Sequence, residues 1–380
     1  MDPRFRRGNL VSIVKYNSDR EQVSNSEIAC DLHMSMPTVL QHIKTLQTKG
    51  IVEETGKHRS SGGRRASLFT LKKDLAYAVG LDIKRDRQIF LIADMLGKTV
   101  YSCTCEVPYE DSFAYFEKIR RNLDAALTAS GLQRSKVVGV GISLPGIVDV
   151  SRNLLLQSHA LGVSNVSFQG VERLIGFPVK IENDANCAAC AELRSYKGNA
   201  VYLSLSDTVG GAVFVAGALH KGDCFKSGEF GHMVIDKDGE QCYCGKRGCV
   251  DAYCSARVLK AAGGGDLNTF FARLKRGEEN AANVWRRYAD YLALSISNLR
   301  MMFDCDVIIG GEVGGYLKDY QIRLMELLGQ YNKFEYDNGY IKIGKFKDDG
   351  SAYGASLLFR EEFIENLFVR PERVADYSVM

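Results

Sequence analysis

Three cysteines lie within eight residues, in the spacing C-x-C-G-x-x-G-C, and a histidine lies ten positions upstream of the first. Thiolates and an imidazole are ligands that Zn²⁺ prefers, and four of them close a tetrahedral site with no open position. Reduced structural cysteines or a redox pair are the alternatives, and Cys254 is a substitute ligand candidate, although helix-like sequence surrounds it. The spacing therefore predicts one structural Zn²⁺ per chain, held by His232, Cys242, Cys244 and Cys249.

The region that would carry this site follows an α/β pattern from residue 76 onward. Strand patterns with short turns open it, a helical pattern covers about 112–129, and a second group of strand patterns begins at 201. Two such halves favour a duplicated, bilobed architecture, in which small ligands commonly bind between the lobes. We therefore expect lobes at 76–195 and 196–380, and a return of the C-terminal segment to the first lobe is compatible with this division.

The first 72 residues have the pattern of a separate basic domain with three short helices and two strands. Of the chain's 49 Lys and Arg and 46 Asp and Glu, this segment holds 12 and 7, giving +5, and the rest holds 37 and 39, giving −2. Ser24 and Glu27 have the spacing of a capping box at the second helix. The asymmetry is typical of a DNA-binding head on a ligand-sensing body, although a well-solvated small domain would also explain it.

The third helical pattern, from about residue 36 to 49, has the features of a recognition helix. Val39, Ile43 and Leu46 recur at i, i+4 and i+7 and would face the core. Ser35 can cap the start of the helix. Polar side chains near that start would meet base edges in the major groove. These candidate DNA contacts are Ser35, Thr38, Gln41, His42 and Thr45.

Residues 51–54 and 66–71 have strand patterns that would pair as a wing. The segment between them contains glycines, which permit close backbone approach, and Arg64 and Arg65, which suit phosphate contacts or a narrow minor groove. We therefore predict a winged helix–turn–helix domain over 1–72 that binds double-stranded operator DNA. A helical protein-interaction module with a flexible basic loop is the alternative.

Together these motifs resemble those of the ROK family (repressors, open reading frames and kinases). The resemblance covers nearly the whole chain, and its most specific marks are residues 229–232, the cysteine segment and residues 182–186. The N-terminal helices with residues 60–65 resemble the operator-binding head of the branch that includes the glucose-, N-acetylglucosamine- and xylose-responsive repressors. The resemblance implies an actin-like, ribonuclease H-like bilobed sugar-kinase fold and a homodimer or higher homo-oligomer.

The resemblance also implies a sugar site. In this family the Asn and Asp of the E-N-D-A-N segment hold sugar hydroxyls, although a polar loop after a strand is the alternative for residues 182–186. His232 would use one ring nitrogen for the sugar and the second for zinc. Asp251 stands where the family usually has Glu, so that contact could be lost, bridged by water or adapted to another sugar. By resemblance the sugar contacts are Asn183, Asp184, Glu229, His232 and Asp251.

The phosphate-binding loops of the family's kinases are altered in this chain. Their D-x-G-G-T, L-G-T-G-x-G-G-G and G-G-G-V segments correspond here to residues 82–86, 205–212 and 310–313. Two unit charges about 5 Å apart repel by roughly 3 kcal/mol at an effective dielectric near 20, so Asp207 would disfavour a bound phosphate. We therefore expect neither ATP nor a catalytic residue, and Asp184 would be the base only in a kinase. The altered positions are Lys84, Arg85, Asp86, Asp207 and Glu312.

These features predict a transcriptional repressor of sugar-utilisation genes that is controlled by a sugar in the cleft. An ATP-dependent sugar kinase of the glucokinase or fructokinase type with a DNA-binding appendage is the alternative. Control by a partner protein is a third reading. The chain has no apolar run of membrane-spanning length and no signal-peptide pattern, so we expect a cytoplasmic protein with no membrane partner.

Overall fold

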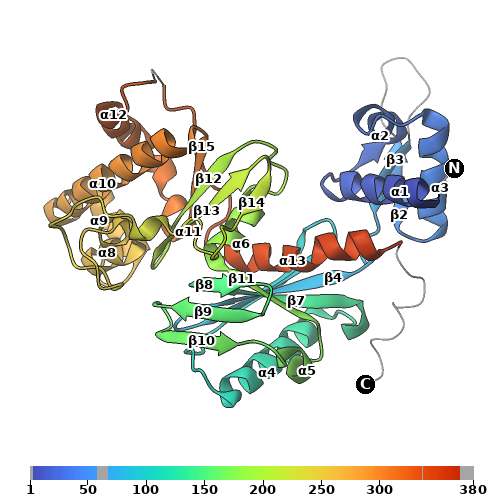
Figure 1. Cartoon of the computed structure of the whole chain (residues 1–380), viewed down its shortest axis with the longest axis horizontal. Coiled ribbons are helices and arrows are strands. Elements are labelled where there is room, and N and C mark those ends of the chain that lie inside the picture. Colours follow the sequence, from blue (N-terminus) through green and yellow to red (C-terminus); the bar gives the residue numbers. More distant parts are fainter. Residues whose placement is uncertain (1–2, 58–66, 336, 369–380) are drawn as a thin grey trace.

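The structure is a computed structural model that describes residues 3–57, 67–335 and 337–368. A small N-terminal head lies beside a body of two lobes, each built around its own sheet (Figure 1). The bilobed α/β architecture that the sequence predicts is confirmed. No helix in the described part of the chain is long and apolar enough to cross a membrane.

The head consists of three helices and an antiparallel sheet of order β1-β3-β2. The predicted capping box is present, because Ser24 Oγ accepts from Glu27 N at 3.2 Å and Ser24 N donates to Glu27 Oε2 at 2.7 Å. Ile13 and Phe69 share one apolar core with Phe359 of the last helix of the body, so the head packs directly on the body. Its elements are α1 (Pro3–Ser18), β1 (Val23–Ser24), α2 (Asn25–Asp31), α3 (Met36–Thr48), β2 (Val52–Lys57) and β3 (Ser67–Leu71).

The first lobe contains a five-stranded sheet of order β11-β7-β4-β5-β6. β4, β5 and β6 form an antiparallel meander, whereas β7 runs parallel to both β4 and β11. A smaller antiparallel sheet, β10-β9-β8, joins the same apolar core. The elements are β4 (Tyr77–Ile83), β5 (Gln88–Asp94), β6 (Thr99–Cys105), α4 (Phe113–Ser130), η1 (Arg134–Lys136), β7 (Val137–Leu144), β8 (Ile147–Asp149), β9 (Leu154–Ser158), β10 (Val163–Ser167), α5 (Val171–Ile175) and β11 (Val179–Asn183).

The second lobe repeats this strand order as β16-β15-β12-β13-β14. Again an antiparallel meander, β12 to β14, is extended by parallel strands, which is the duplication that the sequence predicts. The elements from the lobe junction onward are α6 (Asp184–Glu192), β12 (Ala200–Leu205), β13 (Val209–Val215), β14 (Ala218–His220), η2 (Phe230–His232), α7 (Val250–Cys254), α8 (Ala256–Ala262), α9 (Leu267–Lys275), α10 (Glu279–Phe303), β15 (Asp306–Gly310), α11 (Gly311–Gly314), η3 (Leu317–Tyr320), α12 (Gln321–Tyr331) and β16 (Ile341–Ile343).

The last helix, α13 (Gly350–Asn366), packs on β4, β7 and α6. A Cβ atom on Gly80 of β4 would overlap the carbonyl of Ala352, and one on Gly354 would overlap the carbonyl of Cys187 in α6. Glycine therefore permits the close approach of α13 to both elements. Figure 1 shows α13 running from beside the second lobe to the head.

Candidate functional site

The four predicted zinc ligands come together in one loop cluster of the second lobe. Their ligand atoms all lie within 4.8 Å of one another, with His232 Nδ1 3.8 Å from Cys242 Sγ and Cys244 Sγ 3.8 Å from Cys249 Sγ. A tetrahedral zinc with Zn–S bonds of about 2.3 Å has S–S edges of about 3.8 Å, so the donors fit this ion. Disulfides require about 2.05 Å between sulfurs, which these distances exclude.

His232 has the protonation state that a metal ligand needs. Burial, followed by the positive charge of Lys246, lowers its pKa, which favours the neutral imidazole. With Nδ1 directed at Cys242, its Nε2 faces Tyr243, whose hydroxyl lies 3.4 Å away. The ring therefore has one nitrogen on the cysteine side and one on the side of Tyr243.

Two of the predicted sugar contacts lie where β11 ends and α6 begins. Asn183 caps α6, since its Oδ1 accepts from Asn186 N at 2.9 Å, and its Nδ2 donates to Gly146 O at 2.8 Å. Asp184 follows as a partly buried side chain whose Oδ1 accepts from Ala185 N at 2.9 Å. Withdrawal from water and then the charge of Asp82 raise the pKa of Asp184 to about 7.

Glu229 lies close enough to Asp184 to influence its ionisation. Burial raises the pKa of Glu229, and its carboxylate makes no hydrogen bond or ion pair within the described residues. A buried carboxylate without a partner is costly unless a ligand supplies donors. Asp184 and Glu229 therefore offer uncommitted carboxylate oxygens in one region.

Asp251 requires a correction of the predicted sugar set. Its side chain is fully buried, Oδ2 accepts from Val209 N at 2.6 Å, and Oδ1 pairs with Arg257 at 2.5 Å. Both oxygens are thus committed within the second lobe because the shorter Asp side chain is drawn to the start of β13. Asp251 thus ties α7 to the turn between β12 and β13, and its carboxylate is not available to a sugar in this arrangement.

Three side chains around His232 and Tyr243 were not predicted from the sequence. The rings of His159 and Tyr243 lie 6.1 and 5.4 Å from the His232 ring, and Arg257 lies over the Tyr243 ring at 4.8 Å. His159 follows β9 of the first lobe, so this group crosses from one lobe to the other. Only the position of Tyr243 between two predicted ligands could have singled out one of them.

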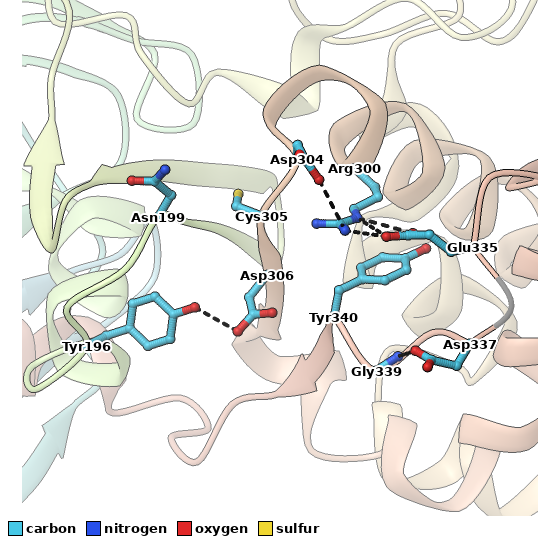
Figure 2. A pocket seen from close by; sticks show the side chains of 10 residues that line it. All are labelled: Tyr196, Asn199, Arg300, Asp304, Cys305, Asp306, Glu335, Asp337, Gly339 and Tyr340. Carbon is cyan, nitrogen blue, oxygen red and sulfur yellow. Dashed lines mark hydrogen bonds and ion pairs between the residues drawn. The ribbon is translucent and has the colours of Figure 1, made fainter.

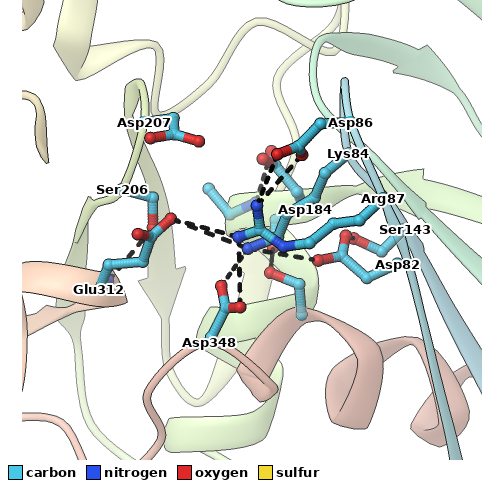
Figure 3. A network of polar contacts seen from close by, with 12 residues as sticks. Asp82, Lys84, Asp86, Arg87, Ser143, Asp184, Ser206, Asp207, Glu312 and Asp348 are labelled. Atoms are coloured by element: carbon cyan, nitrogen blue, oxygen red, sulfur yellow. Dashed lines mark hydrogen bonds and ion pairs between the residues drawn. The ribbon is translucent and has the colours of Figure 1, made fainter. Parts of the chain in front are cut away.

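The altered phosphate-loop positions form a network of ion pairs between the lobes (Figure 3). Lys84 pairs with Asp348 and lies 3.9 Å from Glu312, while Arg87 lies 3.3 Å from Asp348 and 3.8 Å from Glu312. Glu312 also pairs with Lys260 at 2.6 Å. Side chains at the positions of the kinases' phosphate-binding loops are therefore engaged in ion pairs within the chain.

Asp207, whose charge we expect to disfavour a bound phosphate, has a cationic partner in the structure. Its Oδ1 pairs with Lys260 at 2.6 Å, which offsets much of the repulsion that a nearby phosphate would meet. The other two altered positions of the first loop, Arg85 and Asp86, follow Lys84, and Asp86 pairs with Arg87 at 3.1 Å. Asp207 by itself therefore presents little net repulsion to a phosphate.

The recognition-helix prediction needs one correction. His42 is buried, because it lies three residues after Val39 and shares the core face of α3 with Ile43. Gln41 is exposed, Thr38 and Thr45 are partly exposed, and Ser35 caps the helix through Thr38 N at 3.4 Å. Exposed side chains that the sequence analysis missed on this helix are Met36, Leu40 and Lys44. The predicted wing contacts Arg64 and Arg65 lie outside the described residues.

A separate polar hollow of about 430 Å³ lies near the start of β15 (Figure 2). Its Arg300 is paired with Glu335 and lies 3.2 Å from Asp304, and Tyr196 donates to Asp306 at 2.7 Å. Glu312 follows the other end of β15, so the hollow and the ion-pair network lie at opposite ends of this strand. The hollow contains none of the predicted site residues.

Both the body and the whole chain are similar to known proteins. The N-acetylmannosamine kinase of Salmonella arizonae is 31% identical over 59% of this chain and 80% of its own. The xylose repressor of Caldicellulosiruptor bescii is 23% identical over 91% of this chain and 94% of its own. A crystal structure of a ROK family transcriptional regulator, a homolog of the E. coli MLC protein, superposes with a TM-score of 0.72 and 17% identity, covering 96% of this chain and 97% of its own.

The kinase similarity thus covers a smaller share of this chain than the two regulator similarities do. The fold is the actin-like sugar-kinase fold that the sequence predicts. The model of the ROK family matches residues 78–362, which is most of both lobes, and the chain belongs to the ROK family.

Proposed function

We propose that this protein is a transcriptional repressor whose binding to operator DNA is controlled by a sugar in the cleft. The xylose repressors that it resembles over nearly their full length support this function, as does the head that precedes the family body. Gln41, Thr38 and Thr45 near the start of α3 would contact base edges, and Arg64 and Arg65 would contact the DNA backbone from a wing. The head would thus be a winged helix–turn–helix domain.

The observation that carries the proposal is the contrast between the two halves of the proposed cleft. On the nucleotide side, Lys84, Arg87 and Lys260 pair with carboxylates of the chain. On the sugar side, Asp184 and Glu229 keep carboxylate oxygens free of partners among the described residues. A cleft of this kind suits binding of a polyol without phosphoryl transfer.

A structural Zn²⁺ would complete the sugar side. His232, Cys242, Cys244 and Cys249 would hold it, and a fully coordinated zinc supplies loop rigidity and no reaction. The ion would fix the His232 ring by its Nδ1 and so direct Nε2 towards the sugar. Elemental analysis of protein purified without chelator should give about one equivalent per chain.

Control of DNA binding would follow from two arrangements of the lobes. A homodimer would bring two heads to half-sites on one face of a duplex, and a sugar that favours one arrangement would change how the heads meet them. A hundredfold change in operator affinity needs about 2.7 kcal/mol of coupling free energy. The sugar must therefore bind the two arrangements with affinities that differ by this factor.

The test is operator binding across a panel of sugars. The purified full chain would select its operator from random double-stranded DNA, and its affinity would be measured with D-xylose, D-glucose, N-acetylglucosamine and N-acetylmannosamine, free and phosphorylated. We expect one sugar to change operator affinity by at least tenfold. If DNA is selected but no sugar shifts its affinity, the sensing part of the proposal is wrong, and control by a partner protein becomes the better reading.

The second candidate is a sugar kinase with a DNA-binding appendage. The 31% identity to an N-acetylmannosamine kinase favours it. By the family resemblance, Asp184 would be the base of such a kinase. The ion pairs of Lys84, Arg87 and Lys260 argue against it. Incubation of the zinc-loaded chain with ATP, Mg²⁺ and the same panel should yield no sugar phosphate, and turnover of any sugar would favour the kinase.

A further inference from the structure

We propose that Arg194 and Arg360 are positioning residues that couple the cleft to the head by holding the end of α1. This inference deepens the proposed function, because it assigns the residues through which a sugar would alter DNA binding. It rests on contacts at both ends of two helices, α6 and α13.

At the head, both guanidinium groups converge on the end of α1. Arg360 Nη2 donates to Ser18 O at 2.7 Å and lies 3.1 Å from Asp19 Oδ1. Arg194 Nη2 donates to the same carbonyl at 2.6 Å, and its Nε lies 3.4 Å from Asp19 Oδ1. Carbonyls at the end of a helix lack partners within the helix and carry partial negative charge, so two cations suit this position. We call these four residues the α1 clamp.

The clamp is tied to the body by further buried contacts. Arg360 is 5% exposed, and its Nε donates to Met95 O at 2.8 Å in the turn that follows β5. Arg194 Nη1 donates to Tyr353 Oη at 3.0 Å, and Tyr353 Oη in turn donates to Gly97 O at 2.8 Å. A fork of donors that reaches several acceptors at once is a property of arginine that lysine lacks.

At the other end, the same two helices begin in the cleft. Asp184, a predicted sugar contact, is the first residue of α6, and Arg194 follows the last residue of this helix by two positions. In α13, Ser351 Oγ donates to Asp184 O at 3.2 Å, and Asp348 just before the helix pairs with Lys84. Arg360 lies nine positions after Ser351 in this helix, which is about 14 Å at 1.5 Å per residue.

Because α6 and α13 pack closely, a displacement of their starts is transmitted to the α1 clamp at their other ends. Gly354 allows backbone contact with Cys187, so the two helices cannot slide past each other without loss of packing. A ligand that moves Asp184, or an opening of the Lys84–Asp348 pair, displaces the starts of both helices together. The clamp then carries this displacement to α1, whose Ile13 and Val14 lie in the core of the head.

A matched contact between head and body lies outside this route. Lys15 of α1 pairs with Glu365 of α13 at 2.7 Å, and both side chains are about half exposed. Like Arg360, this pair joins α13 to α1, but it touches neither α6 nor the turn after β5. Lys15→Met is therefore the control for removal of a head–body ion pair as such.

The first experiment needs neither sugar nor operator. Hydrogen exchange of the amides of residues 14–18 is measured in the full chain, in Asp348→Asn, in Arg194→Met, in Lys15→Met, and in the double variants with Asp348→Asn. We expect Asp348→Asn to speed exchange at least fivefold. Combined with Arg194→Met it should add less than twofold to the faster single variant, whereas with Lys15→Met the two effects should multiply. No effect of Asp348→Asn, or multiplication with Arg194→Met, would overturn the proposal.

The second experiment uses the selected operator with D-xylose, or with the panel sugar that acts on the unchanged protein. Asp19→Asn and Arg194→Met should reduce the sugar-dependent change in operator affinity to less than threefold. Sugar affinity and operator affinity without sugar should both stay within twofold, whereas a merely destabilised head would weaken operator binding without sugar. Lys15→Met should keep the full change. Full coupling in both clamp variants would contradict the proposal. If the unchanged protein shows no sugar effect, the proposed function fails, and the exchange experiment still decides whether the cleft reaches α1.

Arg360 is tested by Arg360→Lys, because its complete removal from a buried position could prevent folding. Lysine keeps the charge but cannot reach both Met95 O and Ser18 O. We expect the same fivefold or greater acceleration of exchange in residues 14–18 with an unchanged far-ultraviolet circular dichroism spectrum. Exchange at the rate of the unchanged protein would remove Arg360 from the clamp.

Discussion

The two halves of the proposed cleft differ in how the chain uses its own charges. In the nucleotide half, Lys84 and Lys260 each face carboxylates, and Glu312 accepts ion pairs from both lobes. In the sugar half, Asp184 and Glu229 are partly withdrawn from water, which raises the pKa of each, and neither has an ion-pair partner within the described residues. The charges of the nucleotide half are thus paired within the chain, whereas the carboxylates of the sugar half remain available to a ligand.

This difference is what we expect if the chain binds a sugar and does not bind ATP, as the proposed function requires. Paired charges offset part of the cost of their own desolvation, so the nucleotide half needs no ligand to neutralise its charges. Unpaired buried carboxylates cost stability until hydroxyl donors reach them.

The largest effect is expected from loss of the cysteine cluster. Cys249→Ser should lower zinc content from about one equivalent to less than 0.2 and destabilise the fold by about 3 kcal/mol or more, since a zinc site contributes folding free energy directly. Sugar binding should be lost with it, because His232 loses its fixed orientation. Elemental analysis, thermal unfolding and calorimetry measure the three effects.

Cys224→Ser is the control for this variant. Cys224 is exposed and lies outside the cluster, so its replacement should leave zinc content and sugar binding unchanged. Full zinc content in Cys249→Ser would contradict the ligand assignment.

The second effect concerns the carboxylate of the sugar half. Asp184→Asn removes an acceptor that would bind sugar hydroxyls as a charged group, and hydrogen bonds of this kind contribute about 1.5–3 kcal/mol. We expect sugar affinity to fall by about 10- to 100-fold in calorimetry. Asp207→Asn, in the nucleotide half, should change it less than twofold, and equal effects of the two variants would abolish the distinction between the halves.

Much of this arrangement follows from local sequence signals. The capping box of Ser24 and Glu27 and the cysteine spacing each specify their structure within about ten residues. The two sheets were also predictable, because both lobes begin with strand patterns separated by short turns. Fold and metal-ligand candidates were therefore accessible from the sequence.

The parts that the sequence did not predict depend on contacts between distant residues. Asp251 is committed by Val209, 42 positions away, and Asp207 by Lys260, 53 positions away. No periodic pattern reports such pairs. His42 shows a second limit, because a helix face has no sharp edge, and a residue three positions after Val39 can belong to either side.

The third effect is a pH dependence of sugar affinity. Only the ionised Asp184 accepts hydroxyl donors with both oxygens, and its pKa of about 7 means that affinity should fall about tenfold between pH 8 and pH 6. This raised pKa also makes the group's contribution to stability greatest below about pH 4, and that contribution is lost as the pH rises through 7. Calorimetry at several pH values measures the first dependence.

Asp184→Asn supplies the control for this profile. The variant cannot ionise at this position, so its weaker sugar affinity should vary less than twofold over the same range. A profile as steep as that of the unchanged protein would assign the titration to another group, such as Glu229.

The smallest effect is expected from replacement of Gln41 on α3, the helix that we propose to contact DNA. Gln41 is exposed near the start of α3, where a recognition helix meets base edges, and its loss should weaken operator binding by about 1 kcal/mol, or roughly fivefold. Gln47 is also exposed on α3 but lies at the far end, so Gln47→Ala should change operator affinity less than twofold. The measurement is a titration with labelled operator. Equal effects of Gln41→Ala and Gln47→Ala would mean that the start of α3 does not enter the major groove.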